Sequence, residues 1–139
     1  MKYEIIGATV PAVEVTLNRG ESMYTQRGGM AWQTEGIKMT TNAHGGVMKS
    51  LGRMFAGESI FMSTYTSEKD EAKVAFATTV PGAVMPINMS ELPQGFMIQK
   101  GAFLAAEPGV ELNVKLTKRF SFSSYSSIKI LGLSNTIFR

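Results

Sequence analysis

The sequence predicts an all-β fold, either a double-stranded β-helix or a two-sheet antiparallel β-sandwich, with one short helix. Apolar and polar residues alternate with a period of two along much of the chain, which is typical of half-buried strands. Turn-forming residues separate these segments, and the chain holds 14 glycines and five prolines. Many short strands divided by turns are typical of sandwiches and barrels. With 139 residues, 44% of them apolar and 18% charged, the chain has the length and composition of one packed domain.

The first strand is predicted at residues 12–17, where two valines and a leucine share one face and a glutamate and a threonine share the other. Asn18 and Gly20 follow as a turn, because both residue types tolerate a positive φ. Proline–glycine pairs and a charged turn separate the later segments. In chain order, further strands are predicted at residues 21–25, 30–32, 36–41, 59–66, 72–79, 83–89, 96–100, 102–105 and 110–117.

One segment, residues 46–57, departs from the strand pattern. Its apolar residues recur at helical spacing, and Lys49 and Arg53 lie four residues apart beside them. The spacing predicts a short helix of two to three turns that links two β segments. Such a helix packs against its own sheet or against a neighbouring subunit. The predicted interaction surface is therefore made of Lys49, Arg53, Met54 and Phe55.

The last part of the chain differs in composition from the rest. Four of the 14 basic residues lie from Lys118 onward without any acid, which leaves ten basic residues against 11 acids before it. The net charge of +3 therefore belongs to the tail, and the body is close to neutral. We predict a single β domain over residues 1–119. Residues 120–139 are predicted to be a serine-rich, aromatic and basic tail or a terminal edge strand, with a truncated or atypical C-terminus.

The composition excludes several kinds of site. The chain has no cysteine and one histidine, which excludes disulfides, thiol catalysis and metal sites built from cysteines or several histidines. That histidine, His44, is predicted to be an exposed loop residue beside two glycines. Most of the 11 acids fall at turns or on polar strand faces, so we expect no enzymatic activity, no cofactor and no metal. No transmembrane segment or signal peptide is predicted, which favours a cytoplasmic protein.

Ten methionines are a high number for a chain of this length. Methionine fills irregular gaps in cores and also forms adaptable surfaces for partners. The sequence leaves both roles open for a set of six: Met48, Met54, Met62, Met85, Met89 and Met97.

Four segments together carry a family resemblance: GESMYTQRGGMAW at 20–32, LGRMFAGESIFM at 51–62, TVPG at 79–82 and QKGAFLAAEPGV at 99–110. They resemble the bacterial proteins of uncharacterised function that are related to the mitochondrial "altered inheritance of mitochondria" biogenesis family. The similarity runs from residue 1 to about residue 119. It implies a fold similar to the tryptophan RNA-binding attenuation protein, with self-association. The mitochondrial relatives support inner-membrane organisation, and the family supplies no catalytic residues to transfer.

Two functional hypotheses follow from these observations. The first is a non-enzymatic, self-associating scaffold or interaction module that forms a homo-oligomer and binds a protein partner of unknown identity. The alternative is binding of RNA or another single-stranded nucleic acid, which is the less favoured partner. That alternative depends on the basic tail and on Phe120, Phe122 and Tyr125, whose rings are suited to stacking on bases. It predicts salt-sensitive binding that is lost when residues 118–139 are removed.

Overall fold

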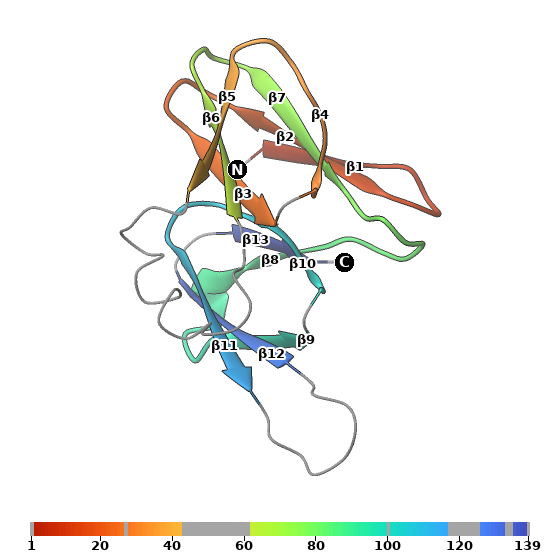
Figure 1. The fold of residues 1–139 in the computed structure, drawn as a ribbon, viewed down its shortest axis with the longest axis vertical. Coiled ribbons are helices and arrows are strands. Elements are labelled where there is room, and N and C mark those ends of the chain that lie inside the picture. The colour runs from red at the N-terminus through yellow and green to blue at the C-terminus, as the bar shows by residue number, and fades with distance from the viewer. Residues whose placement is uncertain are drawn as a thin grey trace.

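The computed structural model describes residues 2–26, 28–42, 62–99, 101–116, 126–132 and 135–138, and the elements in these ranges are strands and one 3-10 turn (Figure 1). The first seven strands are β1 (Lys2–Ile6), β2 (Ala12–Leu17), β3 (Ser22–Gln26), β4 (Met30–Gln33), β5 (Ile37–Asn42), β6 (Met62–Ser67) and β7 (Ala72–Ala77). They are followed by β8 (Met85–Asn88), the 3-10 turn η1 (Met89–Glu91), β9 (Phe96–Gln99), β10 (Phe103–Ala106), β11 (Val110–Leu116), β12 (Ser126–Gly132) and β13 (Asn135–Phe138). The predicted all-β class is confirmed.

The N-terminal strands form a sandwich of two antiparallel sheets. One sheet has the strand order β1-β2-β7-β4, and it faces the β5-β6-β3-β10 part of a six-stranded sheet that continues to β13 and β8. Alternate side chains of β2 and β7 point into the space between the two sheets and form the core. The fully buried ones are Val13, Val15, Val74 and Phe76. Phe76 also meets the Tyr65 ring edge-on, with 5.8 Å between ring centroids. The predicted two-sheet antiparallel sandwich is therefore confirmed.

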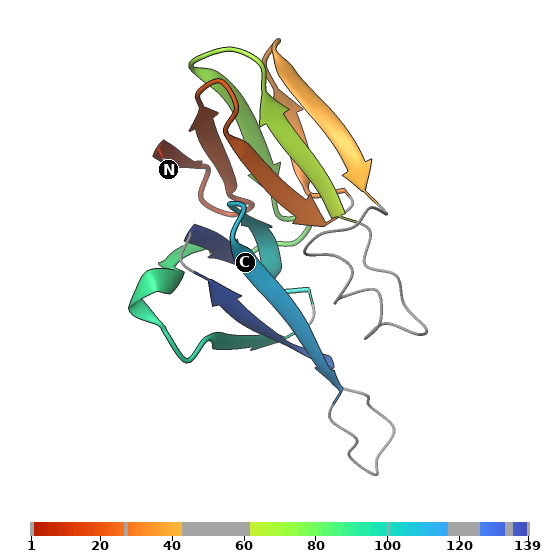
Figure 2. The ribbon, with the colours of Figure 1, turned by 90° about the vertical axis from the view of Figure 1, so that its left-hand side faces the viewer.

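Strands β9, β11 and β12 lie beyond the six-stranded sheet, on the side away from the β1-β2-β7-β4 sheet (Figure 2). A three-stranded sheet of order β11-β12-β9 forms this further layer, and a second core cluster lies under it. Strand β10 contributes to both cores, since Leu104 and Ala105 join the first cluster and Phe103 and Ala106 join the second. A register shift between Phe103 and Ala105 accompanies this division of side chains. The two cores are thus built on opposite sides of one shared strand.

The structure differs from the sequence prediction at both ends of the chain. Residues 2–6 form β1, for which no strand is predicted from the sequence. Within residues 120–139, where a tail or an edge strand is predicted, two interior strands occur instead. Strand β12 lies between β11 and β9, and β13 lies between β10 and β8. The predicted domain boundary at residue 119 stays a prediction.

The helix predicted over residues 46–57 lies outside the described residues. The described helical element is η1, at the end of a segment predicted to be a strand. The side chain of Asn88 caps this turn by accepting a hydrogen bond from the Ser90 backbone N–H at 3.1 Å. Met89 in the turn is fully buried in the second core, which explains why an apolar residue follows the cap.

Candidate functional site

The residues singled out by the sequence fall largely outside the described part of the chain. This holds for the predicted surface of Lys49, Arg53, Met54 and Phe55, for His44, and for the aromatic residues Phe120, Phe122 and Tyr125. The interaction surface and the nucleic-acid alternative therefore stay predictions. The described residues show a different surface, which centres on the unpredicted strand β1.

Strand β1 is an edge strand, because among the described strands it pairs only with β2. Tyr3 lies opposite Val15 and Ile5 opposite Val13. Residues directly opposite in an antiparallel pair point to the same face of the sheet, so Tyr3 and Ile5 share the core face with these two valines. The valines are fully buried, but Tyr3 is 43% exposed and Ile5 is 42% exposed. The core face therefore reaches the surface at this edge of the sheet.

Two neighbouring loops add apolar residues to this edge. Val10 lies in the loop after β1, and Val80 lies in the loop after β7, and each is about half exposed. The loops are joined by backbone hydrogen bonds: the Gly82 N–H donates to the Thr9 carbonyl at 3.1 Å, and the Thr78 N–H donates to the Pro11 carbonyl at 3.4 Å. We name the resulting surface the β1 strip: Tyr3 and Ile5 on the core face of β1, Ile6 at its end on the opposite face, and Val10 and Val80 in the loops.

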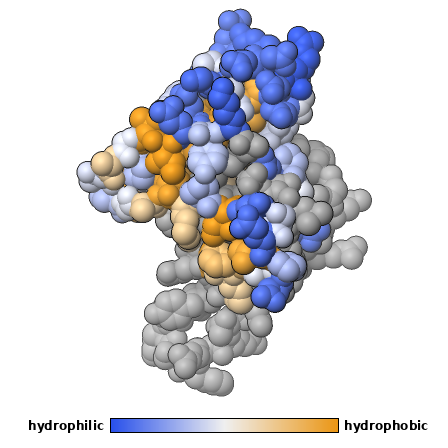
Figure 3. Space-filling model, turned by 180° about the vertical axis from the view of Figure 1, so that it is seen from behind, coloured by the Kyte–Doolittle hydropathy of each residue, from blue (hydrophilic) through white to orange (hydrophobic). Residues whose placement is uncertain are grey.

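Hydrophobic residues also gather on this side of the molecule in the space-filling view (Figure 3). The view is from behind, so β1 and the two loops, which project to the right in Figure 1, lie on its left. Contiguous apolar surface of this kind on a soluble protein marks a site of interaction more often than scattered single residues do. Hydrophilic residues cover the opposite part of the sandwich, at the top of the same view.

The outer face of the same sheet carries charged groups. Glu4 on β1 lies directly opposite Glu14 on β2. Glu14 accepts hydrogen bonds from the Lys73 ammonium at 2.6 Å and from the Trp32 indole at 3.3 Å. The bond from Lys73 is the main cause that lowers the pKa of Glu14, and the bond to Glu14 is the main cause that raises the pKa of Lys73. Glu4 raises the pKa of Lys73 further through its charge. One lysine thus serves two neighbouring carboxylates.

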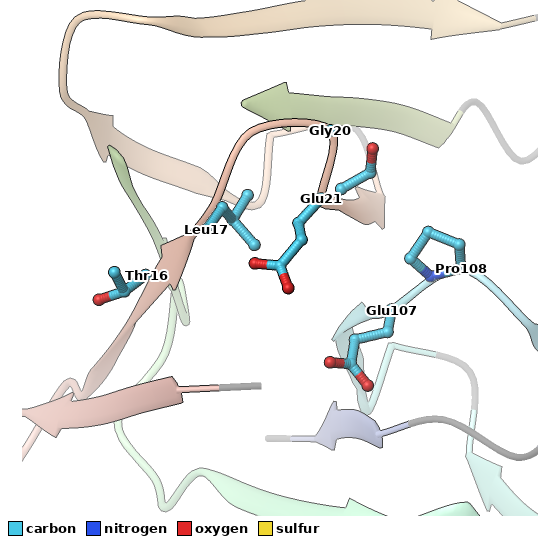
Figure 4. Close-up of a pocket in the computed structure, with 7 residues that line it drawn as sticks. Thr16, Leu17, Gly20, Glu21, Glu107 and Pro108 are labelled. Carbon is cyan, nitrogen blue, oxygen red and sulfur yellow. The ribbon is translucent and has the colours of Figure 1, made fainter. Parts of the chain in front are cut away.

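A pocket of 310 Å³ lies where the turn between β2 and β3 approaches the turn between β10 and β11 (Figure 4). The side chains of Glu21 and Glu107 extend into the same space from these two turns. The carboxylate of Glu21 accepts a hydrogen bond from the Asn18 backbone N–H at 2.7 Å, so it closes the β2–β3 turn. This structural role accounts for Glu21, and we assign no ligand to the pocket.

The described ranges contain neither a metal-binding cluster nor a helix that could span a membrane. No group of three or more histidine, aspartate or glutamate residues there is arranged to hold a metal ion. In the same part of the chain, no helix combines the length and the apolar character that crossing a bilayer requires.

The described methionines of the predicted set of six divide between the two roles that the sequence left open. Met62 and Met89 are buried in the second core, whereas Met85 and Met97 are about half exposed.

The comparison with protein families decides which group the chain belongs to. The family model described as mitochondrial biogenesis AIM24 matches residues 3–136. The chain is a member of the AIM24 family. The resemblance drawn from the four sequence segments is therefore confirmed. The AIM24 match also continues past residue 119, where the similarity was expected to end, and it takes in β12 and the start of β13.

Two proteins to which the chain is similar come from Streptococcus pyogenes. An uncharacterised protein of serotype M6 is 31% identical over 112 residues, which cover 76% of this chain and 44% of the relative. The crystal structure of protein SPYM3_0169 is 25% identical and has a TM-score of 0.71, covering 99% of this chain and 63% of that one. The chain thus spans less than half of the curated relative and less than two thirds of the solved structure.

Proposed function

We propose that this AIM24-family chain is a non-enzymatic, cytoplasmic scaffold or interaction module that works by self-association. The observation that supports this proposal best is the β1 strip, in which the apolar core face of a sheet reaches the surface at an edge strand. The near-neutral body of the chain agrees with it, because assembly of identical copies then meets little overall charge repulsion.

Burial of the β1 strip would supply a sizeable driving force for assembly. Its five side chains are between 40% and 52% exposed. Complete burial of a fully exposed aliphatic or aromatic side chain stabilises by about 1.5–3 kcal/mol. About half of each side chain in the strip is already buried, so association adds roughly half of that amount per residue. Five of them together can provide several kcal/mol, against which the entropy cost of association must be set. Burial of the strip therefore offsets part of the cost of association.

The edge strand adds backbone groups to the same surface. An edge strand presents N–H and C=O groups along one side, and these groups can pair with a strand of another chain. Proteins commonly protect such an edge with proline, a bulge or a short strand. Strand β1 is five residues long and contains no proline, and its pairing with β2 is regular over all five residues. The edge therefore keeps the geometry that a further strand needs.

Absolute mass measured by light scattering over a dilution series tests the proposal. We expect the complete chain to have a multiple of the single-chain mass at micromolar concentration. Ile5→Ser removes apolar area from the β1 strip and should raise the dissociation constant about tenfold, which corresponds to 1.4 kcal/mol. Met39→Ser is the matched control, since Met39 is also about half exposed but lies on β5.

Two results would overturn the proposal. A wild-type chain that stays monomeric at every concentration tested would contradict self-association. Equal weakening by the Ile5→Ser and Met39→Ser variants would show that assembly does not depend on the β1 strip. The non-enzymatic part is tested separately by an unbiased hydrolase screen on the purified chain, where a reproducible turnover would contradict it.

A further inference from the structure

We propose that the surface that covers β1 is β1 of a second copy of this chain, paired antiparallel about a two-fold axis that passes beside Tyr3. The two copies would then form one continuous eight-stranded sheet from two sheets of four. This inference rests on the proposed self-association and adds the partner strand and its register. The charges along β1 identify a second copy as the partner, because shape alone does not distinguish a second copy from another partner.

The two-fold axis limits the registers that are available. When two copies of an edge strand extend one sheet, residues directly opposite each other must lie on the same face. In β1 the axis must therefore pass beside a residue and not between two residues. An axis at Tyr3 places Lys2 of each copy opposite Glu4 of the other. An axis at Glu4 places the two Glu4 carboxylates opposite each other, and like charges in that position destabilise a sheet.

The neighbourhood of Glu4 favours the first register. On the β2 side Glu4 already faces Glu14, and the ammonium of Lys73 lies against Glu14 at 2.6 Å. A lysine on the open side of Glu4 would give each of these two carboxylates a cation. Lys2 of a second copy reaches that position when the axis lies at Tyr3. The sequence Lys2-Tyr3-Glu4 is thus complementary to itself, as an isologous interface requires.

The core face agrees with the same register. An axis at Tyr3 brings the two Tyr3 rings opposite each other, and aromatic pairs across strands are favourable. Tyr3 faces Val15 on the other side, and Val15 belongs to the first core. The pair of rings would therefore join the cores of the two copies into one apolar layer. The exposed part of Tyr3 is then covered by the residue that lies opposite it.

The other edge strands of the two larger sheets lack this complementarity. Strand β5 contains Lys38 and no acid, so two copies of β5 form no pair of opposite charges in any register. Strand β8 contains Pro86, which has no N–H to donate. The register of β4 shifts between Met30 and Trp32, which interrupts a regular ladder. Of the four edges of these two sheets, β1 alone combines a regular register and no proline with side chains of both charges.

Charge reversal tests the register. Lys2→Glu and Glu4→Lys each replace two opposite-charge pairs per dimer by two like-charge pairs, and each should raise the dissociation constant about tenfold at low salt. The double variant Lys2→Glu/Glu4→Lys restores both pairs and should return the dissociation constant to near the wild-type value. Lys38→Glu on β5 is the matched control and should leave it unchanged. A double variant as weak as the single ones would overturn the register.

Cross-linking gives a second, independent test, since the chain has no cysteine of its own. Opposite residues in an antiparallel pair have Cα atoms about 4.5 or 5.5 Å apart, which lies within the range that a disulfide bridges. Tyr3→Cys should therefore form a disulfide-linked dimer on mild oxidation. Glu4→Cys reports the alternative axis, and Met39→Cys reports pairing through β5. Thermal melts of each variant check that it is folded.

The outcomes separate this inference from the proposed function. Cross-linking of Tyr3→Cys alone supports the β1 pair with its axis at Tyr3. Efficient cross-linking of Glu4→Cys or Met39→Cys instead would overturn it, as would an oligomer in which none of the three variants cross-links, and self-association would stand in each case. A wild-type chain that is monomeric by light scattering would overturn both.

Discussion

The two cores of the molecule are built in different ways. In the first core, β1 pairs with its neighbour β2, but the central pairs join distant segments, as β2 does with β7 and β3 with β10. The sheet over the second core contains one pair of neighbouring strands, β11 with β12, and β12 also pairs with β9. The N-terminal sandwich needs no strand beyond β10, whereas this further layer needs β12 from the end of the chain. Formation of the second layer therefore waits for the end of the chain.

The two cores nevertheless share a strand. Strand β10 pairs with β3 on one side and with β13 on the other, and its residues enter both clusters. Damage to either core therefore acts on the same strand. Because both cores depend on β10, we expect the molecule to unfold in one cooperative transition and not in two.

The largest effect is expected from truncation in the first core. Phe76→Ala removes a fully buried ring that meets Tyr65, and it should lower the free energy of unfolding by about 3–5 kcal/mol. Met89→Ala removes a fully buried side chain from the second core and should cost about 2–5 kcal/mol. Urea unfolding, followed by circular dichroism and by fluorescence, measures both changes.

The single tryptophan makes this comparison decisive. Trp32 lies on β4 in the N-terminal sandwich, so its fluorescence reports on that half of the molecule. If the halves are coupled through β10, Met89→Ala shifts the fluorescence transition as far as it shifts the circular dichroism transition. A fluorescence transition that stays at its wild-type midpoint in Met89→Ala would show that the halves unfold independently.

A smaller effect is expected at the seam between β3 and β10. Thr25 is fully buried, and its hydroxyl donates a hydrogen bond to the Leu104 carbonyl at 2.5 Å. Thr25→Val keeps the shape but leaves that bond unmade, which should cost about 1–3 kcal/mol. Thr25→Ser is the matched control, because it keeps the hydroxyl and loses one methyl group. A valine variant more stable than the serine variant would contradict the role of the bond.

The N-terminal sandwich was largely predictable from the sequence, because its pattern is local. The alternation of residues 12–17 gave β2 with its observed bounds, and the inward side chains there are the buried ones. The same pattern also gave β7 within two residues. In these strands the apolar residues are the buried ones, so the period of two in the sequence is enough to predict the strand.

The rest depends on pairing that no local pattern records. Residues 2–5 alternate a lysine and a glutamate with a tyrosine and an isoleucine, so the sequence did contain a short strand signal for β1, and it was missed. A terminal edge strand was one of the two predictions for residues 120–139, but β12 lies between β11 and β9, and the pairing with β9 joins segments that no local pattern connects. The β1 strip was missed for the same reason, since its surface appears only when β1 and the loops containing Val10 and Val80 come together.

The smallest effect is expected where β3 contacts β11. The Tyr24 hydroxyl donates a hydrogen bond to the Val110 carbonyl at 2.6 Å, and its ring stacks on Phe103 with 5.9 Å between centroids. Tyr24→Phe keeps the ring and loses the bond, so it should lower the free energy of unfolding by about 0.5–1.5 kcal/mol at neutral pH.

Alkaline pH gives a second test of the contribution of Tyr24 to stability. Burial is the main cause that raises the pKa of Tyr24 in the folded chain, and the charge of Glu111 adds to it. The unfolded chain therefore releases this proton first, near the ordinary pKa of about 10. The stability that neutral Tyr24 contributes is present below that pH and declines as the pH rises above it. Urea unfolding of wild type and Tyr24→Phe should thus show a difference that shrinks above about pH 10. A difference that stays constant up to pH 11 would place Tyr24 in contact with water and contradict its burial.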